Sequence, residues 1–589
     1  MEMRNSERCI LQWLYILVSL SVVYGRYTRW KSFAIYTNGV IYTVDPFDDE
    51  WDLHPEEAMV VNDHTGYIEY IGDNAVALQY RTDSSYVHDL GGNTVLPGFH
   101  DVHMHPLEAM TELGGGCSVP SNTPPENMLY NISQCKPRDD ATAWVLGHGH
   151  SIEYSIEYIL EHINNGGRPP NEIIDEVMDT NPVIIMEETS HSVWVNSKAL
   201  ELAGITKDTP NNPGGIIMKD ASTGEPNGIL FENAGNEIMD LAMKSFKNLD
   251  EMNYDALLLG LEELRRNGIT SVCDARTYWK RNHHDAWKMA CDDKELTVRA
   301  VLGLWAYPHM NDAEQIQRLK ELYTNGYNKN ECFLKINEIK VYSDGLLEST
   351  TGAMLKPYVK NFHLPGLDEN IGMNYFTQER LEVYFEHLQA FGYDKGFDFH
   401  IHAIGDRGVE EVLNAIEKTK EKGTRHRMTH LEIVNQRDIP RFQELDVIAD
   451  FQVTGTYTLP DKLYRIENVV GESRAKNFIP VKSVEDTGAA VTLSSDWDVS
   501  SLNPFISIQH ATQRGSQSIS VKSAIEMRTI NAAYAMRQEN EVGCLSAGMA
   551  ADFVVINKDI LNIPINQIGT AKVLLTALQG EIIYQLDKK

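Results

Sequence analysis

Residues 94–105 read TVLPGFHDVHMH. The apolar run 94–99 is typical of a buried strand, and His103 and His105 follow it closely. Alternate side chains of an extended chain lie on one face, so we expect the two imidazoles on the same side, about 6–7 Å apart along the backbone. Two histidines at one strand end can hold a metal ion; the alternative is a pair of surface histidines in a loop.

Strands and helices alternate after this stretch. Residues 253–266 have leucines at helical spacing, Gly268 ends that helix, and 269–273 follow as a strand. Residues 397–402 form another predicted strand, and a helix begins at 405–406 and ends before Gly423. Repeated units of this kind predict an α/β protein with a TIM-type (β/α)8 barrel over residues 97–539, whose site lies at the carboxyl ends of the strands.

Both ends of the chain have a different pattern. Short apolar strands separated by turns occur at 34–44 and 58–71, and again at 552–556 and 572–584. We expect residues 27–96 and 540–589 to pair as a composite β-sandwich beside the barrel. Residues 106–250 are rich in turn sequences and interrupt the alternation, which predicts an insertion after the first barrel strand that covers the barrel mouth.

Two later strands offer further histidines. His400 and His402 have the same parity, and His402 lies nearer the carboxyl end of its strand, which makes it the better candidate ligand. His430 follows 28 residues after His402 and is predicted to end the next strand. His426 is the competing candidate, although its earlier position makes it less accessible.

A lysine and an aspartate complete the candidate set. Lys340 lies opposite its apolar neighbours in residues 339–342 and is predicted to face the barrel interior, where an unpaired ammonium is costly. An ion pair with Asp344 is the simplest explanation. Asp496 ends the buried strand 489–495, where an acidic group must be paired, bind a metal or cap a helix.

The composition excludes some classes of partner. The chain has 589 residues and a formal charge of −32, which disfavours nucleic acid and anionic membrane surfaces. Arg4 and Arg8 precede an apolar run that ends near Gly25, so residues 1–25 are predicted to be a secretory signal and the mature chain to begin near Arg26. The alternative is a membrane anchor, but the run is about 15 residues, short of the roughly 20 that span a bilayer.

Six cysteines remain after the signal, an even number for an oxidising compartment. We predict a disulfide between Cys117 and Cys135, because both lie in the turn-rich insertion around the N-glycosylation sequon at Asn131. Ordinary free thiols are the alternative, and the two interpretations carry equal weight.

Residues 97–105 resemble the opening metal motif of the metal-dependent amidohydrolase superfamily. The chain is most similar to the amidohydrolase-3 branch, which includes N-substituted formamide deformylase and the YtcJ-like proteins. The similar segments are 191–200, 228–232, 340–345, 402–407, 425–430, 495–496 and 543–553. Three positions depart from the branch pattern, with Cys273 and Thr429 in place of the usual His and Glu, and Gly149-His150 in place of Gly-Trp.

This resemblance implies a binuclear site. It places His103, His105 and Asp496 on one metal ion and His402 and His430 on the other, with Lys340 carboxylated as the bridge. A carboxylated lysine is anionic, which removes the cost of a buried ammonium. Asp496 is also the expected proton shuttle, and His191 is a candidate contact for the substrate or the oxyanion.

We therefore expect a secreted hydrolase that cleaves a non-peptide carbon–nitrogen bond, in an amide, N-acyl or N-formyl compound, with water activated by zinc. Nitrogen and oxygen ligands favour zinc, in about two ions per chain. The partner is a small molecule, and a homo-oligomer is compatible with the sequence. The alternatives are a mononuclear deaminase on the same ligands and a non-catalytic acidic extracellular protein that retains the barrel.

Overall fold

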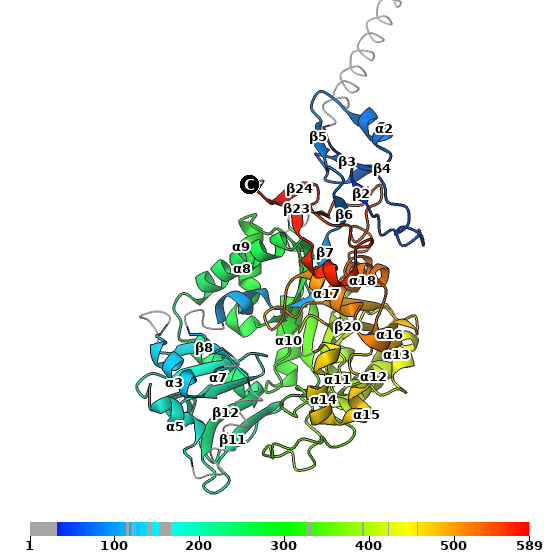
Figure 1. The fold of residues 1–589 in the computed structure, drawn as a ribbon. Coiled ribbons are helices and arrows are strands. Elements are labelled where there is room, and N and C mark those ends of the chain that lie inside the picture. Colours follow the sequence, from blue (N-terminus) through cyan, green and yellow to red (C-terminus); the bar gives the residue numbers. More distant parts are fainter. Residues whose placement is uncertain are drawn as a thin grey trace, which may run out of the picture.

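The computed structural model describes residues 32–112, 117–120, 123, 125–137, 143–151, 167–327, 332–391, 394–421, 423–455 and 458–587. The predicted signal at 1–25 and the predicted mature start lie outside these ranges. Figure 1 shows a central barrel, with strands from both chain ends at one end of the molecule and the cyan segment after the first barrel strand at the other.

The centre of the molecule is a barrel of parallel strands, as predicted. Within the described residues the sheet has eight strands, in the order β21-β20-β19-β18-β15-β14-β13-β7. A parallel bridge between Met104 and Trp497 joins the first strand to the segment after the last. The strands are β7 (Phe99–Met104), β13 (Ile269–Thr277), β14 (Arg299–Trp305), β15 (Leu334–Tyr342), β18 (Asp398–Ala403), β19 (Arg427–His430), β20 (Ile448–Gln452) and β21 (Val491–Ser494).

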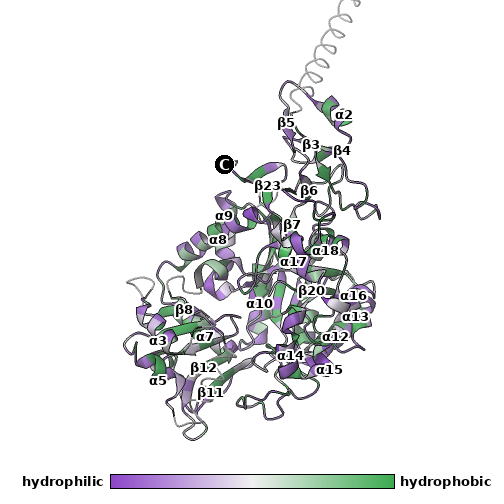
Figure 2. Cartoon of the chain, in the orientation of Figure 1, coloured by the Kyte–Doolittle hydropathy of each residue, from purple (hydrophilic) through white to green (hydrophobic). Residues whose placement is uncertain are grey.

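Amphipathic helices surround the barrel. Helix α12, for example, buries Val409, Val412, Leu413 and Ile416, the apolar positions that recur at helical spacing. Figure 2 shows the mixed hydropathy of outer helices such as α8 and α9. The helices are α8 (Leu249–Arg266), α9 (His283–Asp292), α10 (Asp312–Leu322), α11 (Gln378–Leu388), α12 (Asp406–Thr419), α13 (Ile439–Glu444), α14 (Leu463–Val470), α15 (Glu472–Ala475), α16 (Val481–Glu485), α17 (Pro504–Ala511), α18 (Val521–Met527) and α19 (Ile530–Ala535).

The apolar run at 94–99 is not one strand. Residues Thr94–Pro97 form β6 in a sheet at the chain ends, and the barrel strand β7 begins at Phe99. Gly98 lies between them, and a Cβ there would approach Thr270 Oγ1 to 2.2 Å. An uninterrupted apolar sequence cannot reveal this change of sheet, because both strands are buried along their whole length.

The two chain ends contribute to two small sheets, in the orders β4-β3-β1-β5 and β2-β6-β22-β23-β24. Strand β22 pairs antiparallel with β6, so residues near both termini share one sheet. Side chains of the two sheets share one apolar cluster, which includes Tyr36, Val61, Val95 and Phe553. The elements are β1 (Phe33–Thr37), β2 (Val40–Ile41), β3 (Ala58–Asn62), β4 (Ile68–Gly72), α2 (Asn74–Ala77), β5 (Tyr86–Asp89), β22 (Phe553–Ile556), β23 (Val573–Leu578) and β24 (Glu581–Gln585).

The insertion contains a sheet of its own, which its turn-rich sequence did not indicate. The strand order is β11-β12-β10-β9-β8, and separate apolar clusters pack on its two faces. Its elements are α3 (Pro125–Gln134), β8 (Val145–His150), α5 (Pro170–Asp175), β9 (Val183–Glu187), β10 (Ser192–Val195), α6 (Ser197–Ala203), β11 (Gly215–Lys219), β12 (Pro226–Glu232) and α7 (Asn233–Met243).

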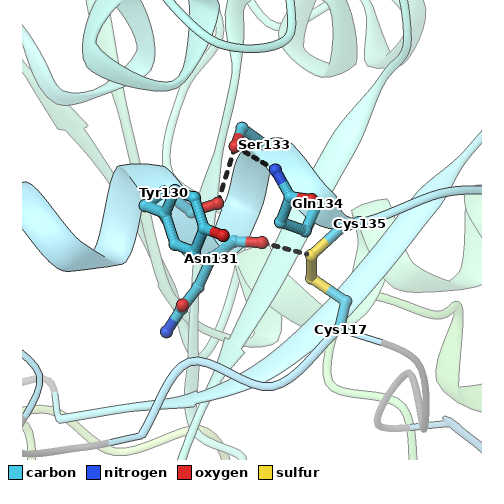
Figure 3. Close-up of a disulfide and its surroundings, with 6 residues drawn as sticks. All are labelled: Cys117, Tyr130, Asn131, Ser133, Gln134 and Cys135. Atoms are coloured by element: carbon cyan, nitrogen blue, oxygen red, sulfur yellow. Dashed lines mark hydrogen bonds between the residues drawn. A yellow bond between two sulfur atoms is a disulfide. The ribbon is translucent and has the colours of Figure 1, made fainter.

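Cys117 and Cys135 form a disulfide in this insertion, with an S–S distance of 2.06 Å. Figure 3 shows the Asn131 side chain pointing away from the sulfur atoms. Asn131 lies in helix α3 of this turn-rich insertion. A second disulfide joins Cys291 to Cys332, while Cys273 and Cys544 are buried free thiols.

A search for membrane spans finds none: in the described ranges, every helix is too short or too polar to cross a bilayer.

Candidate active site

The carboxyl ends of five barrel strands bring the six predicted ligands together. The ring centroid of His103 lies 5.2 Å from that of His105 and 4.9 Å from that of His430, and His430 lies 4.4 Å from His402. Lys340 Nζ is 3.5 Å from both ring nitrogens of His103. The parallel register places Lys340 beside the strand that carries His402.

Asp496 lies at the centre of this cluster. Its Oδ1 is 3.0 Å from His105 Nε2 and 3.3 Å from His103 Nε2, and its Oδ2 is 3.9 Å from His430 Nδ1. Ligand atoms of His103, His430 and Asp496 all lie within 4.8 Å of one another, a spacing that suits a single metal ion. This grouping differs from the one that the resemblance implies, in which His430 shares an ion with His402. The backbone brings Asp496 there directly, because its N–H donates to His103 O at 2.9 Å.

Burial keeps the histidines of the cluster neutral. Burial and the adjacent Lys340 hold the pKa of His103 well below its usual range, and burial with His430 does the same for His402. Burial lowers the pKa of His430 to about 3. Burial alone would raise the pKa of Asp496, but the imidazoles of His103 and His105 hold it well below its usual range. Neutral imidazoles and an ionised carboxylate are the forms that bind metal.

Lys340 is fully buried, and the alternative for it, an ion pair with Asp344, is not formed. In the described chain no carboxylate oxygen lies within 4.0 Å of Lys340 Nζ, whereas Asp344 accepts hydrogen bonds from the backbone N–H groups of Ala353, Ile404 and Gly405. Burial lowers the pKa of Lys340 to about 7, so a large fraction of its amine is neutral at physiological pH.

A polar network behind the cluster orients His103. Its Nδ1 lies 3.0 Å from Thr429 Oγ1, and that hydroxyl donates to Asp450 Oδ2 at 3.0 Å. Gln452 Nε2 donates to both Thr429 Oγ1 and Asp450 Oδ2. A hydroxyl that donates to a carboxylate accepts from Nδ1–H, which leaves His103 Nε2 free to face Asp496.

His400 lies one layer deeper than His402. Its Nε2 is 2.9 Å from His103 Nδ1, and its Nδ1 is 2.9 Å from Arg427 and 3.7 Å from Cys273 Sγ. The positive charge of Arg427 disfavours a metal ion beside His400. His402, in contrast, is the histidine that lies beside His430. His426 lies away from the cluster, where it accepts from Phe399 N and stacks on Phe385.

His191 reaches the cluster from the insertion. Its ring lies 5.3 Å from that of His402 and stacks on Tyr342, while its Nδ1 lies 2.6 Å from Glu232 Oε2. Glu232 also accepts from the hydroxyls of Thr351 and Tyr375. This carboxylate fixes the imidazole, so that His191 presents its other ring nitrogen to the same space as the candidate ligands.

Several residues around the site have left-handed backbone conformations, which are costly for residues other than glycine. The φ angles are +73° at His430, +55° at Asp496, +57° at Glu232 and +63° at Ser190. Each such residue costs of order 1 kcal/mol that the surrounding fold must offset. The fold thus holds His430 and Asp496 in position in spite of this cost.

A cavity of about 190 Å³ lies beside the cluster. Barrel residues contribute His105, His430 and Asp496, and the insertion contributes Glu187, Glu188 and His191. Arg276, which sequence reasoning missed, also lines the cavity; its Nε donates to Glu108 Oε2 at 2.7 Å. Arg276 lies beyond the predicted strand 269–273 but within the observed strand β13, which ends at Thr277, so no signal in the sequence pointed to it.

The sequence profile of the amidohydrolase family matches residues 86–584. The chain belongs to this family. YtcJ of Bacillus subtilis is 25% identical over 94% of the chain and 99% of its own length. N-substituted formamide deformylase of Arthrobacter pascens is 24% identical over 88% of the chain and 94% of its own length. These relatives confirm the amidohydrolase-3 branch.

Solved structures support the same fold. A metal-dependent hydrolase from Pyrococcus furiosus has a TM-score of 0.67 and 22% identity, and the match covers 90% of this chain and 100% of that one. Membership of the family makes the chain a metal-dependent hydrolase that acts on carbon–nitrogen bonds. The donor set fits such a metal, since the Nδ1 atoms of His105 and His402 are buried without hydrogen-bond partners in the described structure.

Proposed function

We propose that this amidohydrolase is a secreted zinc enzyme that hydrolyses an amide, N-acyl or N-formyl bond of a small, non-peptide molecule. The convergence of six side chains in one cluster carries the proposal, and three of them, His105, His430 and Asp496, line the cavity. The other three are His103, Lys340 and His402. The name of the Arthrobacter relative supports the substrate class.

His103, His105 and Asp496 would hold one ion, and His402 and His430 a second. Nitrogen and oxygen donors of this kind favour zinc. When bound, the ions supply an acidic water and a Lewis acid for the substrate carbonyl. Lys340 would bridge the ions as a carbamate. Its neutral amine attacks carbon dioxide, a nitrogen–carbon bond forms and one proton leaves, which turns a buried base into an anion.

The remaining steps fall to side chains of this chain. Asp496 accepts the proton of the attacking water on a carboxylate oxygen and then delivers it to the leaving nitrogen, which departs poorly as an anion. His191, fixed by Glu232 at 2.6 Å, faces the substrate oxygen. The insertion contributes Glu187, Glu188 and His191 to the walls of the same cavity.

Metal analysis of the purified protein, followed by a panel of N-formyl, N-acetyl and longer N-acyl amines, tests this function. We expect about two zinc ions per chain and hydrolysis that a chelator abolishes and zinc restores. Turnover of amino-heterocycles with one ion per chain, and of no amide, would instead indicate the mononuclear deaminase.

Secretion belongs to the same proposal. It is supported by the Arg4/Arg8 and apolar pattern before Gly25, and by the two disulfides, which are typical of oxidising compartments. Expression in secretory cells should give mature protein that begins near Arg26 and carries glycan at Asn131. An N-terminus at Met1 would contradict the cleavage.

A further inference from the structure

A second recess adjoins the cavity that holds the candidate ligands. It has a volume of about 320 Å³ and shares Glu187, Glu188 and Val499 with that cavity. It continues along Trp497 and Asp498, directly after the proposed proton shuttle Asp496. A substrate whose scissile bond lies beside Asp496 can therefore extend into this recess.

Four carboxyl groups line the recess, from Glu108, Glu187, Glu188 and Asp498. Burial raises the pKa of Glu187 to about 8, so the negative charge comes from the other three. Among the described residues no lysine or arginine lines the recess. The nearest guanidinium, Arg276, lies 2.7 Å from Glu108 and 3.7 Å from Asp498, so one positive charge faces two negative ones. The electrostatic potential in the recess is therefore negative, which favours a cationic ligand.

Asp498 provides an independent indication of a ligand. Its side chain is 1% exposed, and its Oδ2 accepts from Ser190 Oγ at 3.1 Å. Its Oδ1 has no hydrogen-bond partner in the described part of the chain. A buried carboxylate oxygen without a donor is costly, so the position is matched to an N–H group that arrives with the ligand.

The arrangement suits an organic cation better than a further metal ion. The ligand atoms of Asp498, His105 and Asp496 lie close enough to one another to hold a metal ion. In the described ranges, however, none of the three glutamates of the recess lies at metal-ligand distance from Asp498 as part of such a group. The walls also include apolar surface from Met110, Trp497 and Val499. Dispersed carboxylates beside apolar walls fit an alkyl chain that ends in an ammonium group.

We infer that the amine released by this enzyme carries a second, protonated nitrogen, which binds in the recess against Asp498. The substrate class is thus an N-acylated diamine or a related N-acyl compound with a cationic tail. This inference rests on the proposed function, because it takes the scissile bond to lie beside Asp496.

Three N-acetyl compounds of similar length test the inference: N-acetyl-1,4-diaminobutane, N-acetylpentylamine and N-acetyl-5-aminopentanoate, with cationic, neutral and anionic tails. Binding is measured by calorimetry on the zinc-loaded Asp496→Asn enzyme, and hydrolysis on the wild type. We expect the cationic compound to bind about tenfold more tightly than the neutral one and the anionic compound to bind most weakly, as expected for one screened charge pair.

Asp498→Asn in the Asp496→Asn background keeps the shape but removes the charge, and should abolish the preference for the cationic tail. Glu188→Gln, a second recess variant, should reduce it. Glu444→Gln, an exposed change on α13, is the matched control and should leave it intact. Equal binding of the cationic and neutral compounds, or a preference that survives Asp498→Asn, would overturn the inference. Cation-selective binding without hydrolysis of any of the three by the wild type would count against the proposed function alone.

Discussion

Thr429 Oγ1 lies 3.0 Å from Nδ1 of His103. The same hydroxyl donates to Asp450, so it accepts a hydrogen bond from Nδ1–H of His103. This leaves Nε2 of His103 directed toward Asp496. Thr429 departs from the usual glutamate of the branch, and in this chain its hydroxyl sets the tautomer of a candidate metal ligand.

Thr429→Val removes this acceptor while it keeps the volume of the side chain. We expect the affinity for zinc to fall about 10- to 100-fold, the usual cost of losing a partner of a metal-binding histidine. Competition with a chromophoric chelator measures it. Thr429→Ser keeps the hydroxyl and should bind zinc as the wild type does. A Thr429→Val protein with unchanged zinc affinity would show that His400 alone orients His103.

Lys340→Ala tests the bridging role of the lysine. The wild type should hold about two zinc ions, and the variant should lose at least one while its circular dichroism spectrum is preserved, because a shared ligand supports both positions. Metal content by mass spectrometry decides the result. One ion per chain in fully active wild type, unchanged in Lys340→Ala, would favour a mononuclear site.

The buried His426 makes stability depend on pH. Burial lowers its pKa to about 4 in the folded state, against about 6.5 when unfolded. The fold favours the neutral imidazole. The contribution of His426 to the free energy of unfolding is therefore complete above pH 6.5 and is lost as the pH falls toward 4. The stability difference between wild type and His426→Gln should therefore shrink by about 2 kcal/mol from pH 7 to pH 5. Denaturant unfolding of the metal-free proteins measures this difference.

Phe505→Leu is the control for this pH effect, because Phe505 is buried, has no titratable group and packs on Phe99, not on His426. Its stability cost should be the same at both pH values. A His426→Gln difference that is equally constant would show that His426 does not cause the pH dependence.

The disulfides make a prediction about the secreted protein. A peptide map without reductant should contain a Cys117–Cys135 pair and a Cys291–Cys332 pair, with Cys273 and Cys544 unmodified because both are buried. Free Cys117 and Cys135 in that map would argue against an oxidising compartment.

Much of the site could be predicted from sequence because its signals are local. The parity of side chains along a strand and the position of strand ends point to His103, His402 and Asp496 without any knowledge of tertiary contacts. The barrel could be predicted for the same reason, from helical and strand periods such as those of α12.

What sequence reasoning missed depends on contacts between distant segments. Arg276 meets Glu108 across 168 positions, and Asp498 meets Ser190 across 308. No local pattern encodes such pairs. The change of sheet at Gly98 was hidden because β6 and β7 are both fully buried and the apolar residues 94–99 run across it without interruption. The insertion sheet was hidden by frequent turn residues.

The central claim is that Asp496 moves the proton between water and leaving nitrogen at a metal-bound site. The most direct measurement is turnover and metal content of Asp496→Asn beside His103→Ala. Asp496→Asn keeps one coordinating oxygen but cannot accept the proton, so it should retain zinc and lose roughly 10²- to 10⁴-fold in turnover. His103→Ala should lose zinc together with rate. An Asp496→Asn enzyme that retains zinc and works within about threefold of the wild-type rate would contradict the account.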